Sequence, residues 1–377
     1  MIKNKIIFIC GSLEPGKDGV GDYTRRLGGE LIRQDHQIQI LGLFDKEVKS
    51  AGIEIQCDAG VAIKCLRIPL KYPASSRYSL AKAFIDEYNP KCLSLQFVSY
   101  SFHKRGLPFG LAENLKSFGK NLKWHLMFHE LWIGHNFSDG INDYLIGYIQ
   151  KNIIKKIIFQ LSPIVVHTTT KYYQSILSQN NIQAQVLPVF SNLGRGKGNN
   201  KILFNYLPDQ IRDNRDSFLW CCLFGRIGSI TESVEKSLKQ LKTISSMVGK
   251  KLCIIHVGIN SKKNSFSDFL KTEDIDFFEL GFRAEEEIVM LFSKCDIGLT
   301  TYSISLASKS GSISAMLYND LPVCVLNQGC TSQETPFLKH VNNLELNSFL
   351  NQKRDFFKNF SAEASAKNLS KELNIKS

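Results

Sequence analysis

The sequence predicts an α/β protein with two domains, each built around a parallel β-sheet. First, its 377 residues are more than one hydrophobic core usually organises. Second, short apolar runs alternate with helix-spaced segments along most of the chain, as expected for parallel strands joined by crossover helices. Third, residues 191–200 are rich in glycine and lack apolar periodicity, which indicates a connection. We expect domains at 1–190 and 216–355, a linker at 191–215 and terminal helices at 356–377.

The composition is that of a basic globular protein. Hydrophobic residues make up 43% of the chain, charged residues 22%, and the net charge is +12. A positive balance favours anionic partners, such as phosphorylated substrates, an anionic membrane surface or nucleic acid. The lysines are dispersed and no nucleic-acid-binding module is recognisable, so we expect no nucleic-acid partner.

Cysteine usage and hydropathy indicate a cytoplasmic protein. The ten cysteines include no CxxC pair, and several lie inside expected strands, which is typical of reduced proteins. No run approaches the roughly 20 apolar residues of a spanning helix. The first apolar run, residues 6–10, is too short for a signal peptide. We expect a cytoplasmic protein that is soluble or peripheral at the inner face of the membrane.

The first domain is expected to open with a strand at 5–10, a glycine-rich loop and a helix at 23–33. This order is typical of dinucleotide-binding folds. However, the loop lacks GxGxxG spacing, and no acidic residue follows the second strand until Asp45. We therefore expect no nicotinamide or other cofactor. The other strands are expected at 38–43, 61–68, 92–97, 121–129, 163–168 and 184–189, and the other helices at 79–88, 141–160 and 172–179.

Candidate ligand contacts follow the strands of this domain, because ligands of open α/β sheets gather at the carboxyl ends of strands. The glycine loop contributes Gly19, Val20, Gly21, Asp22 and Tyr23. The segment after strand 92–97 contributes Tyr100, His103 and Lys104, for which a solvated loop is the alternative.

His129 is the last residue of the strand expected at 121–129, and Glu130 follows it directly. Imidazole titrates near neutral pH, so this position suits general acid–base catalysis or a phosphate contact. A capping His-Glu pair on a loop is the alternative. His135 lies too late for a zinc-binding HExxH motif, so we expect no metal.

The helix at 141–160 carries Lys151, Lys155 and Lys156 beside an apolar stripe. The stripe consists of Ile149, Ile153, Ile154, Ile157 and Ile158. Such a helix covers a sheet or lies on an anionic bilayer.

The second domain is expected to hold two groups of phosphate ligands. Strand 218–224 delivers Arg226, whose guanidinium can bridge phosphate oxygens. Strand 297–301 leads to Lys309, Ser310, Gly311 and Ser312, and a helix follows at 313–318. A small-residue turn that opens a helix presents unpaired N–H groups to an anion. The alternatives are an ordinary crossover turn, which the stretch taken alone favours, and a surface carboxylate as the partner of Arg226. The other strands are expected at 251–257, 277–281 and 323–326, and the other helices at 232–247 and 285–294.

The stretch from Cys295 to Val325, together with the glycine loop and Gly225-Arg226-Ile227, resembles glycosyltransferase family 4 and related GT-B glycosyltransferases. The order and spacing of elements agree along nearly the whole chain. Three expected ligand residues differ: Ala307 and Ala315 stand where the family pattern has glutamates, and Thr231 stands where it has a lysine. In addition, Asp320 stands where glycine is usual.

The resemblance implies a GT-B architecture, with two Rossmann-like domains facing a cleft and terminal helices that cross back to the first domain. It implies that a hexosyl group is transferred from a nucleotide sugar to a glycan or a lipid-linked acceptor, with retention of anomeric configuration and without a required metal ion. The setting that it implies is bacterial polysaccharide or glycoconjugate assembly. His129 would then face the sugar or phosphate, Arg226 and residues 309–312 the diphosphate, and Tyr100, His103 and Lys104 the acceptor.

Two other functions remain open. The three altered motif residues favour a non-catalytic GT-B-like partner or regulatory protein with a decayed donor site. A sugar-nucleotide epimerase or hydrolase of the same architecture would need more carboxylates than Glu130.

Overall fold

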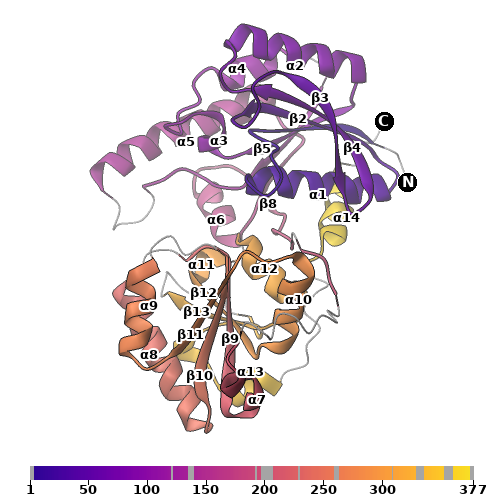
Figure 1. Cartoon of the computed structure of the whole chain (residues 1–377). Coiled ribbons are helices and arrows are strands. Elements are labelled where there is room, and N and C mark those ends of the chain that lie inside the picture. The colour runs from indigo at the N-terminus through magenta and orange to yellow at the C-terminus, as the bar shows by residue number, and fades with distance from the viewer. Residues whose placement is uncertain are drawn as a thin grey trace. The chain divides into compact units, whose positions relative to one another are not determined.

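The structure, a computed structural model, describes residues 4–119, 122–134, 140–191, 193–196, 207–227, 230–258, 263–307, 309–327, 335–351 and 360–373. The chain divides into two compact units. The first unit comprises Met1–Pro188 and Ala362–Ser377, and the second comprises Val189–Ser361. Each unit is an α/β domain with its own sheet (Figure 1).

The first unit is built on an eight-stranded sheet of order β3-β4-β2-β1-β5-β6-β7-β8. Its central strands pair in parallel, with Ile6 opposite both Ile38 and Cys92. The strands are β1 (Lys5–Cys10), β2 (Gln37–Asp45), β3 (Gly52–Asp58), β4 (Val61–Pro69), β5 (Cys92–Phe97), β6 (Lys123–Phe128), β7 (Val165–Thr168) and β8 (Gln185–Val186).

The helices of the first unit connect these strands. They are α1 (Gly19–Arg33), α2 (Ala74–Tyr88), α3 (Ser99–Phe102), α4 (Leu111–Lys116), α5 (Ile141–Leu161), α6 (Lys171–Gln179) and α14 (Ala362–Glu372). The expectation of a wholly parallel sheet is wrong at one edge. Strand β3, which the sequence analysis did not identify, pairs antiparallel with β4 through a turn at Ala59 and Gly60. Its Ile53 and Ile55 are exposed, so β3 lacks the apolar burial by which the other strands are recognised.

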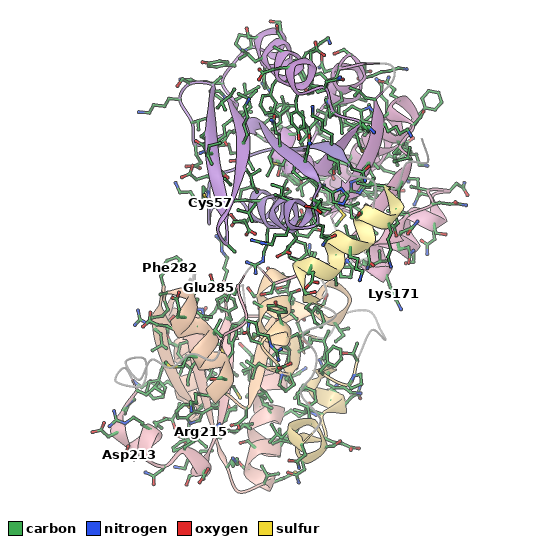
Figure 2. The ribbon with its side chains drawn as sticks, turned by 90° about the vertical axis from the view of Figure 1, so that its right-hand side faces the viewer. Cys57, Lys171, Asp213, Arg215, Phe282 and Glu285 are labelled. Carbon is green, nitrogen blue, oxygen red and sulfur yellow. The ribbon has the colours of Figure 1, made fainter. Side chains whose placement is uncertain are left out.

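Helix α14 belongs to the first unit although it lies 174 residues after Pro188 (362 minus 188). It packs beside α1, as the two views show (Figures 1 and 2). The His36 Nε2 and Ser370 Oγ atoms lie 2.8 Å apart, and the Gln34 side chain donates to the Glu363 carbonyl. Leu369 and Leu373 are fully buried, so this helix completes the core of the first unit.

The second unit is built on a six-stranded parallel sheet of order β11-β10-β9-β12-β13-β14. Its strands are β9 (Phe218–Phe224), β10 (Lys251–Val257), β11 (Asp276–Gly281), β12 (Ile297–Ser303), β13 (Val323–Asn327) and β14 (Leu338–His340). Its α-helices are α7 (Asp209–Asp213), α8 (Glu232–Met247), α9 (Lys263–Thr272), α10 (Glu285–Lys294), α11 (Ile304–Ala307), α12 (Gly311–Tyr318) and α13 (Leu346–Asn351), with 3₁₀ turns η2 (Arg215–Ser217) and η3 (Val341–Asn343).

Helices cover both faces of this second sheet (Figure 1). Apolar side chains of α8, α9 and α13 form one core cluster, and those of α7, α10 and α12 form the other. Leu207 and Ile211 belong to the second of these clusters. The expected linker at 191–215 is therefore too long, because its last part is packed into the second unit.

Candidate functional site

In the second unit, two neighbouring strands bring the expected phosphate ligands together. Strand β9 ends at Phe224 and pairs with β12, whose following segment leads into α12. Gly225 adopts a φ of 102°, and a Cβ atom there would lie 2.5 Å from the Ser312 Oγ. The turn that carries Arg226 therefore touches the first turn of α12.

The start of α12 has the geometry of an anion site. Ser310 caps the helix, and its Oγ accepts a hydrogen bond from the Ile313 N–H at 3.4 Å. The N–H groups of a helix's first turn otherwise have no intrahelical partner and lie at the positive end of its dipole. Arg226 is exposed, and no described residue hydrogen-bonds its guanidinium or pairs with it. Lys309, half-buried, precedes the cap.

Strand β10 and the residue after it hold the Gly225 turn in place. The Gly225 N–H donates to the Val257 carbonyl at 2.9 Å. Gly258 has a φ of 134°, and a Cβ there would lie 2.2 Å from the Gly225 oxygen. Glycine is therefore favoured at both positions: each has a left-handed φ, and at Gly258 a side chain would also displace the backbone of Gly225.

His256 holds the same turn and was not identified from the sequence. Its Nε2 lies 2.9 Å from the Gly225 carbonyl oxygen, and since a carbonyl only accepts, Nε2 carries the proton. Its Nδ1 faces the Glu279 carboxylate at 3.5 Å. Burial lowers the pKa of His256, while Gly225 and Glu279 oppose that shift. A histidine within the apolar strand KLCIIHV was the available signal.

The positions that depart from the family 4 pattern have structural roles here. Ala307 and Ala315 are fully buried in the core, so neither offers a ligand contact. Thr231 caps α8, and its Oγ1 accepts from the Val234 N–H. Asp320, where the pattern has glycine, takes a left-handed φ of 59° and pairs with Arg195.

In the first unit, the expected cleft loop is partly wrong. Gly19, Val20, Gly21 and Asp22 form the first turn of α1, because Asp18 caps the helix and its Oδ1 accepts from the Gly21 N–H at 2.8 Å. These residues are followed by Tyr23, whose phenol is buried; burial raises its pKa.

The loop before α1 is held in place by a buried ion pair. The Asp45 carboxylate accepts hydrogen bonds from the Ser12 hydroxyl and the Leu13 N–H, each at 3.0 Å. Arg67 donates to the same carboxylate at 2.8 Å. Burial alone would raise the pKa of Asp45, but the bond from Arg67 and the backbone donors lower it. The carboxylate therefore fixes the loop as an anion.

His129 lies at the carboxyl end of β6, buried against the ring of Tyr23, with centroids 4.7 Å apart. Its Nε2 lies 2.9 Å from Gln96 Oε1. An amide oxygen only accepts, so Nε2 carries the proton and Nδ1 holds a lone pair.

Burial lowers the pKa of His129 to about 3. A ring with so low a pKa is neutral and a weak base near pH 7, and the expectation that His129 transfers protons stays a prediction. Neutral His129 is instead suited to accept a hydrogen bond from a hydroxyl group. Glu130 follows it and is half-buried.

The acceptor-side candidates follow β5. Tyr100 lies in α3 and is partly exposed, while His103 and Lys104 are exposed. The His103 Nδ1 accepts from the N–H groups of Arg105 and Leu107, so part of its role is to cap its own turn. A Cβ on Gly11 would lie 2.7 Å from the Ser101 Cβ. Helix α3 therefore lies against the loop that precedes α1.

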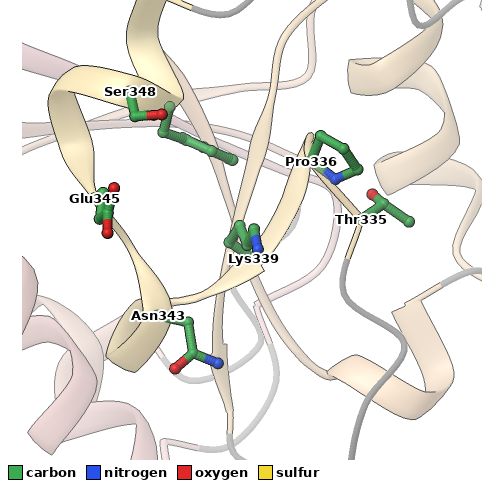
Figure 3. A pocket seen from close by; sticks show the side chains of 7 residues that line it. Thr335, Pro336, Lys339, Asn343, Glu345 and Ser348 are labelled. Carbon is green, nitrogen blue, oxygen red and sulfur yellow. The ribbon is translucent and has the colours of Figure 1, made fainter.

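Two hollows lie away from these residues. One, of about 540 Å³, is surrounded by side chains of β14, the loop after it and α13, including Lys339, Asn343 and Glu345 (Figure 3). The other, of about 720 Å³, lies beside β7, α6 and β8. None of the expected site residues lines either hollow. The expected site residues lie instead at the carboxyl ends of the strands.

Among the residues that the structure describes, no group of three or more His, Cys, Asp or Glu side chains is arranged to hold a metal ion. Over the same residues, no helix has the length and hydropathy needed to cross a membrane.

The architecture is that of GT-B glycosyltransferases of known structure. The chain resembles an α,α-trehalose-phosphate synthase from Burkholderia xenovorans in complex with glucose-6-phosphate, at 8% identity and a TM-score of 0.55, over 98% of this chain and 100% of that one. It also resembles an E. coli trehalose-6-phosphate structure bound with UDP-2-fluoro glucose, at 9% identity and a TM-score of 0.56, over 98% and 99%.

A glycosyltransferase from Rickettsia africae is similar at 13% identity and a TM-score of 0.56, over 99% of this chain and 98% of that one. The sequence matches no family model and no curated protein. At these identities the likeness establishes the fold: two Rossmann-like α/β domains, as in GT-B glycosyltransferases.

Proposed function

We propose that this protein is a glycosyltransferase that moves a sugar from a nucleotide-sugar donor to an acceptor. The observation that carries the proposal is the contact between the Gly225–Arg226 turn and the first turn of α12. A guanidinium and a helix N-terminus at one sheet edge suit the diphosphate of such a donor. The fold supports this, since a structure of the same architecture is bound with UDP-2-fluoro glucose.

The donor side of the proposal assigns Arg226, Lys309, Ser310, Gly311 and Ser312 to the diphosphate. These groups would stabilise the charge that develops on the leaving nucleoside diphosphate. In the first unit, we assign the lone pair of His129 to a sugar hydroxyl and Glu130 to the reacting sugar. The start of α1 at residues 19–23, with Tyr100, His103 and Lys104, is assigned to the acceptor.

A thermal-shift and calorimetric screen of nucleoside diphosphates and nucleotide sugars tests the donor site. A ligand at a hundred times its dissociation constant stabilises the folded protein by about 2.7 kcal/mol. Arg226→Ala is expected to weaken binding by roughly 10- to 150-fold, because hydrogen bonds to charged groups contribute about 1.5–3 kcal/mol.

Arg212→Ala is the matched control, since Arg212 lies in α7 of the same unit and pairs with Asp209 and Asp213. Binding to this control should equal that of the unchanged protein. Failure of every nucleotide to bind would favour the alternative, a non-catalytic partner protein, for which the buried Ala307 and Ala315 are the supporting observation.

The resemblance to family 4 adds finer points to the proposal: hexosyl transfer with retention, no required metal or cofactor, and a glycan or lipid-linked acceptor in polysaccharide or glycoconjugate assembly. A cytoplasmic location is also proposed. It is supported by the nine described cysteines, which are free thiols and, except for Cys57, buried.

We further propose that the first unit binds an anionic membrane surface through α5. The apolar stripe noted in the sequence faces inward, since Ile153, Ile154 and Ile157 are buried. A different stripe is exposed: Ile141, Tyr144, Leu145 and Tyr148 have 56–82% of their surface accessible. Their spacing places them on one helix face.

Basic groups accompany this exposed stripe of α5. The Lys151 ammonium lies 5.6 Å from the centroid of the Tyr148 ring, and Lys155 is exposed. Aromatic and aliphatic side chains beside lysines suit the boundary between lipid headgroups and acyl chains. Figure 1 shows the helix extending to one side of the first unit.

Sedimentation with phospholipid vesicles tests this surface. Binding is expected with phosphatidylglycerol-containing vesicles, to weaken with added salt, and to be absent with pure phosphatidylcholine. The double variant Tyr144→Ser, Tyr148→Ser should reduce binding at least about tenfold, from the apolar surface it withdraws. Phe282→Ser, which alters an exposed aromatic residue of the second unit, is the control. Equal binding by both variants would rule out α5 as the contact.

A further inference from the structure

A continuous chain of hydrogen-bonding side chains crosses the interior of the first unit. Nε2 of His129 lies 2.9 Å from Gln96 Oε1, and the Gln96 Nε2 donates to Ser94 Oγ at 2.8 Å. Ser94 Oγ lies 2.7 Å from Nδ1 of His125, whose Nε2 lies 2.9 Å from Nδ1 of His167.

The chain ends on helix α14. Nε2 of His167 contacts the Oε2 atom of Glu372, in the last turn of that helix. This chain of side chains therefore links β5, β6 and β7 to helix α14. Its other end is His129, at the carboxyl end of β6.

The carboxylate fixes the direction of every bond in this chain. Among the described residues, the Glu372 oxygen makes no hydrogen bond of regular geometry, but a lone pair on His167 Nε2 would face its negative charge. His167 therefore carries its proton at Nε2 and accepts at Nδ1. His125 must then donate from Nε2 and accept at Nδ1, and the single hydroxyl proton of Ser94 points to His125. Ser94 accepts from the Gln96 amide, whose oxygen accepts from His129.

The three imidazoles are neutral, which makes this order obligatory. His125 and His167 are buried to within 1% of full burial, and His129 to within 7%. Burial lowers the pKa of all three, to about 3 for His129 and about 4 for His167. A neutral imidazole has one N–H, so reversing one ring would set two donors or two lone pairs against each other in the interior.

We propose that Glu372 of the C-terminal helix is a positioning residue that holds His129 in the Nε2–H tautomer, with its Nδ1 lone pair presented at the carboxyl end of β6. The use of that lone pair on a sugar hydroxyl rests on the proposed function. The tautomer itself is measured on the protein without substrate, so the two can fail separately.

The experiment is nitrogen NMR of the full-length protein with labelled histidines at pH 7.5, where the carboxylate is ionised. The two tautomers give distinct nitrogen shifts, and His129→Gln assigns the signal. The unchanged protein should show the Nε2–H form of His129 in excess by roughly tenfold or more, the ratio expected from one unsatisfied buried donor.

Two variants break the chain at different places. Glu372→Met removes the acceptor while keeping an unbranched side chain, and should leave His129 as a mixture of tautomers. Ser94→Ala breaks the middle and should release His129 but leave His167 in its Nε2–H form. Ser370→Ala, which loses the contact of α14 with His36, controls for looser docking of the helix and should change neither ring.

The proposal is overturned if the unchanged protein holds His129 as the Nδ1–H form. It is equally overturned if Glu372→Met and Ser94→Ala both retain the Nε2–H excess. A release of His129 by Ser370→Ala to the same extent as by Glu372→Met would show that helix docking, and not the carboxylate, sets the tautomer.

Discussion

At the scale of single residues, burial decides what the histidines of the first unit can do. Sequence reasoning placed His129 correctly at a strand end, where an exposed imidazole would titrate near neutral pH. The structure shows that its other side faces the interior, next to Gln96. A buried neutral imidazole acts as a directional hydrogen-bonding group, and the partner of His129, Gln96, lies 33 residues away in the sequence.

Because the pKa values of its buried histidines are lowered, we expect the first unit to lose stability in mild acid. The pKa values of His125, His129 and His167 are lower in the folded than in the unfolded chain. The unfolded chain therefore binds more protons below about pH 6.5, and stability falls as pH falls, by about 1.4 kcal/mol per pH unit for each histidine. These three histidines give about 4 kcal/mol per unit between pH 6 and 5. The pKa of buried His36 is also lowered and adds to this slope, while the raised pKa of Glu372 opposes it.

Urea unfolding followed by tryptophan fluorescence measures this dependence. A Trp220→Phe background leaves Trp124 and Trp132, both in the first unit. In that background, His129→Gln should reduce the slope by about 1.4 kcal/mol per pH unit, because one titrating histidine is gone. A stability that stays constant from pH 7 to 5 would show that these rings take up protons in the folded state.

At the scale of elements, buried strands and amphipathic helices were predictable from the sequence. Strands β1, β5, β9 and β10 and helices α8 and α10 have the predicted bounds, because each is apolar along one period and ends at polar or glycine residues. The edge strand β3 was missed because its apolar residues face solvent. Helix α1 begins at Gly19, four residues before the expected start at residue 23, because Asp18 caps it.

The candidate site was predictable only where it depends on strand ends. The close approach of the Gly225 turn to α12 followed from the order of strands, since β9 and β12 are neighbours. The support beneath it was not predictable, because His256 reaches the Gly225 carbonyl from a different strand. Such contacts depend on side-chain direction within the folded sheet, which a local pattern does not specify.

At the scale of the whole molecule, each unit has its own core, yet the last helix completes the first unit rather than the second. Val189–Ser361 forms one compact unit, while Ala362–Ser377 belongs to the other. The first unit therefore cannot be complete until helix α14 has been synthesised. The contact of Glu372 with His167 makes the same helix part of the interior that supports His129.

Ending the chain after Ser361 is expected to destabilise the first unit selectively. The truncation removes Leu369 and Leu373, both fully buried, and burial of a leucine side chain contributes about 1.5–3 kcal/mol. The loss is about 3–6 kcal/mol, a large part of the stability of a single domain.

Urea unfolding followed by tryptophan fluorescence tests this truncation. In the Trp220→Phe background, which reports the first unit, the urea midpoint should fall. In a Trp124→Phe, Trp132→Phe background, which reports the second unit through Trp220, it should stay constant. The point variant Leu369→Ala should shift the first midpoint in the same direction by a smaller amount, through the cavity it leaves. A larger shift of the second midpoint than of the first would contradict the assignment of this helix to the first unit.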